Sequence, residues 1–440
     1  MTTILSFAFV LGVLVFVHEL GHFMAAKRLG IKVLKFQLGF NPTVASFKRG
    51  DTEYSIGALP LGGFVKMAGE NVDEASGNPE EFLSRTKWER FQVLFMGPAM
   101  NLGLAFVLTT VVLYQGAQIP VYEDQPVVVG AIAEGSPAST VDIRPGDRIV
   151  SAADRSVLTW EEFYLAVAPK VNREIDVRLV RHGVESTVRL TPTASEEGGR
   201  FEIGDVGVLP DVHPYVPSVN PGEPADRAGV KAGDVIVAVN GKPITFRTHL
   251  RKAIASHPGQ EITLSIVRAG SPISIQVTPE RRGAIGWLGI GISDETKAIK
   301  PGLVEAARLS LDKNVQYTGL IFGTVWGLIT RETSPKQLMG PVAIAQLSGE
   351  QAQLGWIALL SLMASISLNL GLLNLLPIPI LDGGHILIMA LEGVARRDFS
   401  AQVKEKMLFA GFVVIMMLMV TVIYNDLTRI SWIERLMPWR

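Results

Sequence analysis

Four long apolar stretches stand out along the chain, at 4–26, 91–114, 354–377 and 407–424, and the segments between them are mostly polar. Each stretch is close to the roughly 20 residues that an α-helix needs to cross the hydrocarbon core of a membrane. A fifth apolar segment, 317–329, is too short to cross comfortably, so we expect an amphipathic helix at the membrane interface. The pattern predicts a polytopic α-helical membrane protein with four transmembrane helices.

Basic residues near the ends of these stretches predict an orientation. They are Lys27, Arg28, Lys32 and Lys35 after the first stretch, Arg85, Lys87 and Arg90 before the second, and Arg396, Arg397, Lys404 and Lys406 before the fourth. Because basic loops stay in the cytoplasm, both termini and the section 117–353 are expected outside, which in a bacterium is the periplasm. The first stretch has no basic segment before it, so we interpret it as a retained span rather than a signal peptide.

Composition narrows the classes of partner and of metal site. The chain of 440 residues is 48% hydrophobic and carries a net charge of only -1, without a run of basic residues, so no nucleic acid partner is expected. The absence of cysteine excludes disulfides and thiolate metal sites.

The polar section contains an internal repeat at an offset of 87 residues, which places Pro137 on Pro224, Ala138 on Ala225, Gly146 on Gly233, Asp147 on Asp234 and Ile149 on Ile236. Each copy has the strand, helix-start and Gly-Asp turn pattern of a small α+β module. Asn240-Gly241 predicts a hairpin turn in the second copy, and Asp154-Arg155 is expected in that place in the first. The pattern resembles the bacterial type of PDZ domain over 125–194 and 205–280, which leaves both peptide binding at a sheet edge and steric exclusion open.

The motif H-E-x-x-H occurs inside the first apolar stretch as His18, Glu19 and His22. On a helix, positions i and i+4 share one face, so both imidazoles can bind one Zn²⁺ while Glu19 serves as general base. Ionisable side chains inside a span each cost roughly 2.5–3.5 kcal/mol on insertion scales, and coordination of a metal would offset that cost.

A catalytic zinc site typically takes three protein ligands, so a third must come from elsewhere in the chain. Asp382 is the strongest candidate, because Pro377 and Pro379 break the helix before it and the following glycines free the backbone. Such irregular backbone at membrane depth must be buried in protein or face water. His385 is the rival, and Glu70 and Glu392 are weaker alternatives.

Three motifs together resemble the site-2 protease family of intramembrane zinc metalloproteases: VHELGH at 17–22, GPAMN at 97–101 and NLLPIPILDGG at 374–384. The resemblance implies one Zn²⁺ per chain held by His18, His22 and Asp382, with Glu19 as catalytic acid/base. It also implies that Asn374, Pro377 and Pro379 lie near bound substrate. We expect Gly97, Pro98 and Asn101 to give structural support, because small residues let helices pack closely and Asn101 can hydrogen-bond across the interface.

The resemblance further implies that 39–69 forms a cytoplasmic, membrane-re-entrant β-like loop, whose unpaired strand edge could accept an extended substrate. A plain cytoplasmic hairpin is the alternative. The expected parts are the first transmembrane helix (1–28), a cytoplasmic segment with the loop (29–90), the second helix (91–116), two periplasmic PDZ-like α+β domains (117–200 and 201–296), interfacial helices (297–353), the third helix with its Asp382 loop (354–406), and the fourth helix with a tail (407–440).

These features predict a protease of the bacterial inner membrane that cuts transmembrane helices within the lipid bilayer, with its active site open to the cytoplasm. The resemblance implies a single-span anti-sigma factor already cut on its periplasmic side as substrate, together with remnant signal peptides. A peptide or chain terminus would be the ligand of the PDZ-like domains. The alternatives are a non-catalytic scaffold that presents these domains and a transporter with broken helices.

Overall fold

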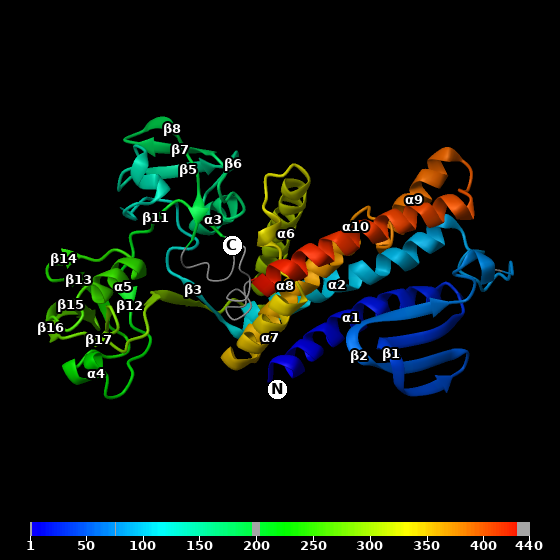
Figure 1. Ribbon diagram of the computed structural model, residues 1–440, viewed down its shortest axis with the longest axis horizontal. Coiled ribbons are helices and arrows are strands. Elements are labelled where there is room, and N and C mark those ends of the chain that lie inside the picture. Colours follow the sequence, from blue (N-terminus) through cyan, green and yellow to red (C-terminus); the bar gives the residue numbers. More distant parts are fainter. Residues whose placement is uncertain (1, 75, 196–202, 429–440) are drawn as a thin grey trace. The chain divides into compact units, whose positions relative to one another are not determined.

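The computed structural model describes residues 2–74, 76–195 and 203–428 and divides into two structural units (Figure 1). The first unit contains the chain up to Gly116, Lys300–Trp326, and the part from Leu338 onward. The second contains Ala117–Ile299 and Gly327–Gln337. Each unit has hydrophobic clusters of its own.

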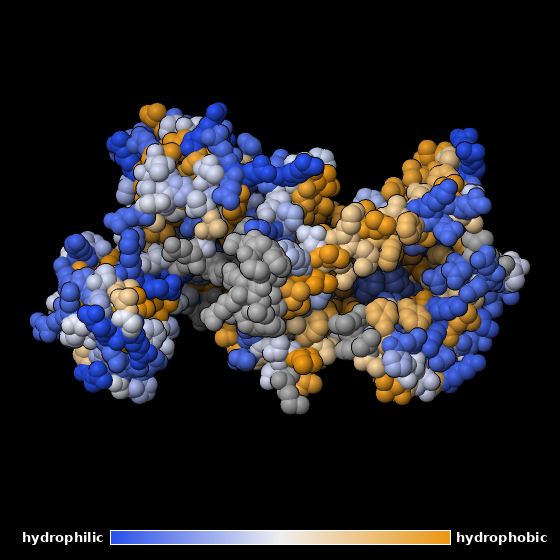
Figure 2. Space-filling model, viewed as in Figure 1, coloured by the Kyte–Doolittle hydropathy of each residue, from blue (hydrophilic) through white to orange (hydrophobic). Residues whose placement is uncertain are grey.

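Four helices of the first unit are long and apolar enough to cross a membrane, as the sequence predicts: α1 (Thr2–Arg28), α2 (Lys87–Gln115), α8 (Trp356–Asn374) and α10 (Ala401–Thr428). Three of them extend beyond the apolar stretches at both ends. The third is shorter than the stretch 354–377, because it ends at Asn374 just before Pro377, and proline cannot continue a helix. Figure 2 shows apolar residues gathered over α10, where Phe412, Val414 and Met417 are exposed.

Helices α1, α2 and α8 pack together in the first unit. Val10 and Leu14 of α1 form a buried cluster with Met363 of α8, and Leu104 of α2 packs against it. At its start, α2 has a capping box in which Thr86 and Glu89 satisfy each other's backbone N–H groups. This packing fixes the helix that carries His18 and His22 against two neighbours.

The predicted β-like segment forms a hairpin of β1 (Val33–Arg49) and β2 (Thr52–Met67). Phe36 of β1 faces Tyr54 of β2 on one side and Val65 of β2 on the other, so the long strands fold back on themselves. Phe36 also makes edge-to-face contacts with Phe16 and Phe23 of α1 at 6.0 and 5.4 Å between ring centroids. The hairpin is thereby held against the helix that carries the H-E-x-x-H motif.

The rest of the first unit contains the 3₁₀ turn Val72–Glu74, the helix α6 (Leu303–Ile329) up to Trp326, and the helices α7 (Pro341–Leu354) and α9 (Asp382–Ala395). The segment 317–329 is the second half of α6. Tyr317 and Ile321 of α6 pack against a cluster that includes Leu372 of α8, whereas Phe322 and Trp326 are exposed. Helix α6 is therefore two-sided, and its position at the membrane interface stays a prediction.

The second unit contains two α+β modules joined in sequence. The elements of the first are β3 (Ala117–Pro120), β4 (Ala131–Ile132), 3₁₀ turn Pro137–Thr140, β5 (Arg148–Ala152), β6 (Arg155–Ser156), α3 (Trp160–Val167), β7 (Ile175–Arg181), β8 (Val184–Leu190), β9 (Thr193–Ala194), β10 (Gly204–Asp205) and β11 (Val208–Leu209). Those of the second are β12 (Pro214–Tyr215), α4 (Pro224–Ala228), β13 (Val235–Val239), β14 (Lys242–Pro243), α5 (Arg247–Ala255), β15 (Ile262–Arg268), β16 (Ser271–Val277), β17 (Glu280–Arg282), β18 (Ile285–Trp287), β19 (Ser293–Asp294) and β20 (Thr296–Ile299), before 3₁₀ turn Pro335–Gln337.

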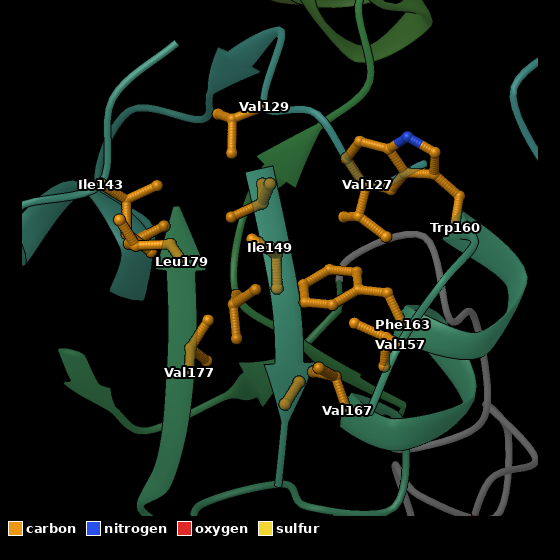
Figure 3. Packing of buried hydrophobic residues seen from close by; sticks show 14 of the residues in the cluster. Val127, Val129, Ile143, Ile149, Val157, Trp160, Phe163, Val167, Val177 and Leu179 are labelled. Carbon is orange, nitrogen blue, oxygen red and sulfur yellow. The ribbon is translucent and has the colours of Figure 1, made fainter. Parts of the chain in front are cut away.

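Each module has a sheet covered by one helix. In the first, the strand order is β6-β5-β7-β8, and Ile149 and Leu179 of the sheet meet Trp160 and Phe163 of α3 (Figure 3). In the second, the order β16-β15-β13-β12-β19 places Ile236, Leu264 and Ile266 against Leu250 of α5. The burial of these apolar side chains supplies the main stabilisation of both modules.

An ion pair recurs at equivalent positions of the two modules. The buried carboxylate of Asp147 accepts hydrogen bonds from Arg181 at 2.7 and 2.8 Å, and that of Asp234 accepts them from Arg268 at 2.6 and 2.8 Å. The Arg181 hydrogen bonds hold the pKa of Asp147 below its usual value. Both pairs obey the offset of 87 residues seen in the sequence.

The hairpin turn of the second module lies at Asn240-Gly241, with φ of 50° and 75°. The turn of the first module is at Ala153 and Asp154, with φ of 49° and 62°, one residue earlier than expected at Asp154-Arg155. The offset of 87 residues places Ala153 on Asn240 and Asp154 on Gly241, so the expected position was one residue too far along the chain.

Candidate metal centre

His18 and His22 lie one turn apart on the same face of α1. Both side chains are buried, and their rings meet edge to face with centroids 4.8 Å apart. Their Nε2 atoms are 3.2 Å from each other. The helical spacing of the motif thus brings two metal-binding nitrogens to one point.

Asp382, the first residue of α9, meets both histidines. One carboxylate oxygen, Oδ2, is 3.2 Å from His18 Nε2, and the other, Oδ1, is 3.5 Å from His22 Nε2. A tetrahedral zinc site with metal–ligand bonds of roughly 2.0–2.2 Å has ligand atoms about 3.3–3.6 Å apart. The spacings of 3.2–3.5 Å between the two Nε2 atoms and the two oxygens of Asp382 are close to this range.

The donor set fits zinc chemically as well. Two imidazole nitrogens and one carboxylate oxygen are a typical catalytic zinc set, which leaves a fourth position for water or substrate. Among the described residues, His18, His22 and Asp382 are the only group of three such side chains whose ligand atoms lie within 4.8 Å of one another. His385, Glu70 and Glu392 are therefore outside this group, and Glu392 instead forms ion pairs with Lys404 and Lys87.

The outer nitrogens of the two histidines also have partners. His22 Nδ1 is 2.8 Å from the backbone oxygen of Val93, and His18 Nδ1 is 3.2 Å from Nδ2 of Asn101. Both partners belong to α2. Such contacts orient the rings of metal-binding histidines and select the nitrogen that carries the proton.

Two glycines allow α1 and α2 to approach closely at this level. A Cβ atom at Gly97 would overlap the ring of His22, and one at Gly21 would overlap the backbone of Met96. Pro98 and Asn101 are buried beside Gly97 on the same helix. Small residues in facing spans permit this contact.

The loop between α8 and α9 sets the position of Asp382. Asn374 is the last residue of α8, and Pro377 and Pro379 lie in the loop. Gly384 packs on the backbone of this loop at Pro379, and Gly411 of α10 packs on the same proline, where any side chain would overlap. Ile380 has φ of 96°, a conformation that is strained for a β-branched residue. The loop is thus tightly held on both sides just before Asp382.

Glu19 lies next to the hairpin. A Cβ atom at Gly63 of β2 would be 3.2 Å from Cγ of Glu19 and 3.0 Å from Cγ1 of Val15. The stretch of β2 from Gly63 to Met67 pairs with β1 on one edge, and among the described strands nothing pairs with its other edge. A free strand edge therefore runs beside the carboxylate of the H-E-x-x-H motif.

Reasoning from sequence missed several residues of this region. The carbonyl of Val93 has no side-chain signal that could have revealed it. Gly97 and Asn101 are four residues apart, so a shared helix face was foreseeable, but their contacts with His22 and His18 were not. Ser367 of α8, whose hydroxyl donates to the backbone oxygen of Asn101 at 2.8 Å, was also missed.

Comparisons with known proteins bear on the family to which the chain belongs. The family model described as "Peptidase family M50" matches residues 6–418. The chain is 32% identical to "Regulator of sigma-E protease RseP" of Escherichia coli over 97% of this chain and 98% of that protein. It is 33% identical to "Putative zinc metalloprotease RSc1411" of Ralstonia nicotianae, over 98% and 99% of the two chains. A solved PDZ domain of an SdrC-like protein from Listeria monocytogenes covers 21% of this chain and 92% of its own, at a TM-score of 0.17 and 18% identity.

Proposed function

Because the chain belongs to peptidase family M50 and is a zinc metalloprotease, we propose that His18, His22 and Asp382 hold one Zn²⁺ and that Glu19 is the catalytic acid/base. The observation that carries this proposal is the convergence of the two Nε2 atoms, 3.2 Å apart, with the Asp382 carboxylate, whose oxygens lie 3.2 and 3.5 Å from them, inside a bundle of apolar helices. When bound, Zn²⁺ would polarise the scissile carbonyl and lower the pKa of a water molecule.

The residues of the chain divide the remaining work. Glu19 accepts a proton from the attacking water and donates one to the leaving amine, so the peptide bond is replaced by a carboxylate and an amine. The outer contacts of His18 and His22 keep the rings aimed at one point. The rigid loop before α9 keeps Asp382 beside them.

The free edge of β2 supports a role in substrate binding. A peptide bond in a helix is shielded, so a transmembrane substrate must unwind before it is cut. We place the unwound segment along Gly63–Met67, where backbone hydrogen bonds of a new strand would hold it beside Glu19. Asn374, Pro377 and Pro379 would line the other side of the substrate.

The positions of basic residues support an inner-membrane orientation with the active site open to the cytoplasm and both termini outside. In this arrangement the hairpin is a cytoplasmic, membrane-re-entrant loop, and the two modules are periplasmic PDZ-like domains. They would exclude proteins with large outer domains or bind a peptide or chain terminus. The resemblance of the three motifs to the site-2 protease family leads us to propose a single-span anti-sigma factor, already cut outside, as substrate.

Cleavage of a model transmembrane substrate by the purified, bilayer-reconstituted protein tests the proposal. We expect a chelator to stop cleavage and added Zn²⁺ to restore it. His22→Ala and Asp382→Ala should lose both zinc and activity, whereas Glu19→Gln should retain zinc and lose activity. Full cleavage by His22→Ala and Asp382→Ala, or by zinc-free protein, would disprove the assignment.

A further inference from the structure

The two candidate zinc-binding histidines have outer partners of different chemistry. His22 Nδ1 faces a backbone carbonyl, that of Val93, at 2.8 Å. A carbonyl can only accept, so the ring proton of His22 must be on Nδ1, and Nε2 carries the lone pair. His18 Nδ1 faces the side-chain amide of Asn101 at 3.2 Å, and an amide can either donate or accept.

The orientation of the Asn101 amide decides where the His18 proton resides. With the amide nitrogen toward the ring, Nδ1 accepts, and the proton on Nε2 can be donated to Asp382 Oδ2 at 3.2 Å. With the amide oxygen toward the ring, Nδ1 carries the proton and Nε2 has a free lone pair. Only the second orientation lets His18 Nε2 bind a cation together with His22.

Helix packing alone does not require an amide at the position of Asn101. Its side chain is fully buried in α2, and its Oδ1 has no hydrogen-bond partner among the described residues. A buried amide atom without a partner costs about 1–3 kcal/mol, and a leucine of similar shape would avoid that cost. A polar group retained at such a cost indicates a role beyond helix packing.

We infer that Asn101 is a positioning residue whose amide is turned so that the oxygen, and not the nitrogen, faces His18. The oxygen then accepts a hydrogen bond from His18 Nδ1–H and keeps Nε2 of His18 available to the metal. The inference rests on the proposed zinc site and goes beyond the structural support expected from the sequence. Loss of an outer partner of a metal-binding histidine typically weakens metal binding by about 10–100-fold.

Zinc affinity of the purified full-length protein, measured by competition with a chromophoric chelator, tests the inference. Asn101→Leu removes the acceptor, and its affinity should fall by about 10–100-fold. Asn101→Asp can only accept, so it should bind zinc at least as tightly as the native chain. A role in packing predicts the opposite for Asp, because a carboxylate fits an apolar interface worse than leucine.

Two further variants complete the experiment. Ser367→Ala removes the hydrogen bond to the backbone oxygen of the same residue and should leave zinc affinity within twofold. His18→Ala reports whether the site itself exists, and it should lose zinc. If Asn101→Leu does not fold, Asn101→Ala is used in its place, with thermal unfolding in chelator as the check on folding.

Three outcomes would overturn the inference, provided that His18→Ala loses zinc and so shows that the site exists. The first is native-like zinc affinity in the Leu or Ala variant of Asn101. The others are an equal loss of affinity in Ser367→Ala, or a loss in Asn101→Asp as large as in Asn101→Leu. Undiminished zinc binding by His18→Ala would instead overturn the proposed metal site.

Discussion

Gly97→Ala is expected to disable the candidate metal centre while the protein stays folded. Gly97 of α2 faces the ring of His22 so closely that the added methyl group cannot be accommodated in place. Either the ring must rotate away from Nε2 of His18, or α2 must move away from α1. Both adjustments separate atoms that now lie 3.2 Å apart.

The size of the effect follows from the distances. The new Cβ atom would lie 2.9 Å from His22 Cδ2 and closer to two other ring atoms, whereas ordinary contacts begin at 3.4 Å. The ring must therefore retreat by at least about 0.5 Å, which exceeds the roughly 0.2 Å within which metal–ligand distances are held. Overpacking of this kind costs about 1–3 kcal/mol, or about 5- to 150-fold in zinc affinity.

Zinc content per chain, zinc affinity and cleavage of a transmembrane substrate should be measured on the same preparations. Gly103→Ala is the matched control, because Gly103 is on the same helix and a Cβ atom there meets nothing within 4 Å. The control should behave as the native protein. A Gly97→Ala protein with native zinc affinity and native cleavage would refute the argument that close helix packing positions His22.

Three other predictions concern two ion-pair or capping carboxylates and the loop before Asp382. The pKa of Asp147 is lowered chiefly by the hydrogen bonds of Arg181, so the unfolded chain binds a proton at this carboxylate more readily than the folded chain does. The contribution of the ion pair to stability is therefore complete above about pH 5 and falls as the pH drops below about 4. Asp147→Ala should lower the free energy of unfolding at neutral pH by about 1–3 kcal/mol and flatten this acid dependence, as thermal melts at several pH values would reveal. Asp426 accepts hydrogen bonds from three backbone N–H groups at the start of α7. Asp426→Ala should therefore cost about 0.5–2 kcal/mol of stability and leave the zinc content unchanged. A melting temperature equal to the native one would contradict this prediction. Ile380→Gly should relieve about 1–3 kcal/mol of backbone strain, partly offset by the greater flexibility of glycine in the unfolded chain. It should also slow cleavage, because the loop before Asp382 becomes less ordered. An unchanged melting temperature and unchanged turnover would show that the φ of Ile380 has no such role.

The second unit illustrates how far a repeat can be followed in sequence. The offset of 87 residues revealed Asp147 and Asp234 as equivalents, and the same offset relates Arg181 to Arg268. The two arginines were overlooked because nothing near them in the chain identifies them as partners of the aspartates. Their role depends on the antiparallel pairing of β5 with β7 and of β13 with β15, which brings the pairs together across 34 residues.

Sequence alone determined the features that depend on short-range regularity. The lengths of the apolar stretches predicted α1, α2, α8 and α10, and the 3.6-residue period of a helix placed His18 and His22 on one face. Pro377 and Pro379 likewise predicted the helix break before Asp382, because a proline disrupts the helix within its own turn of the chain.

Only the tertiary structure decided which groups meet across elements. It brings the carboxylate of Asp382, and not the imidazole of His385, to the two histidines. It also places Gly63 beside Glu19 and Asn101 beside His18. These contacts join residues between 44 and 364 positions apart, and no periodicity extends over such separations. They arise from the close packing of particular helix faces, which small residues such as Gly97 permit and which local sequence does not encode.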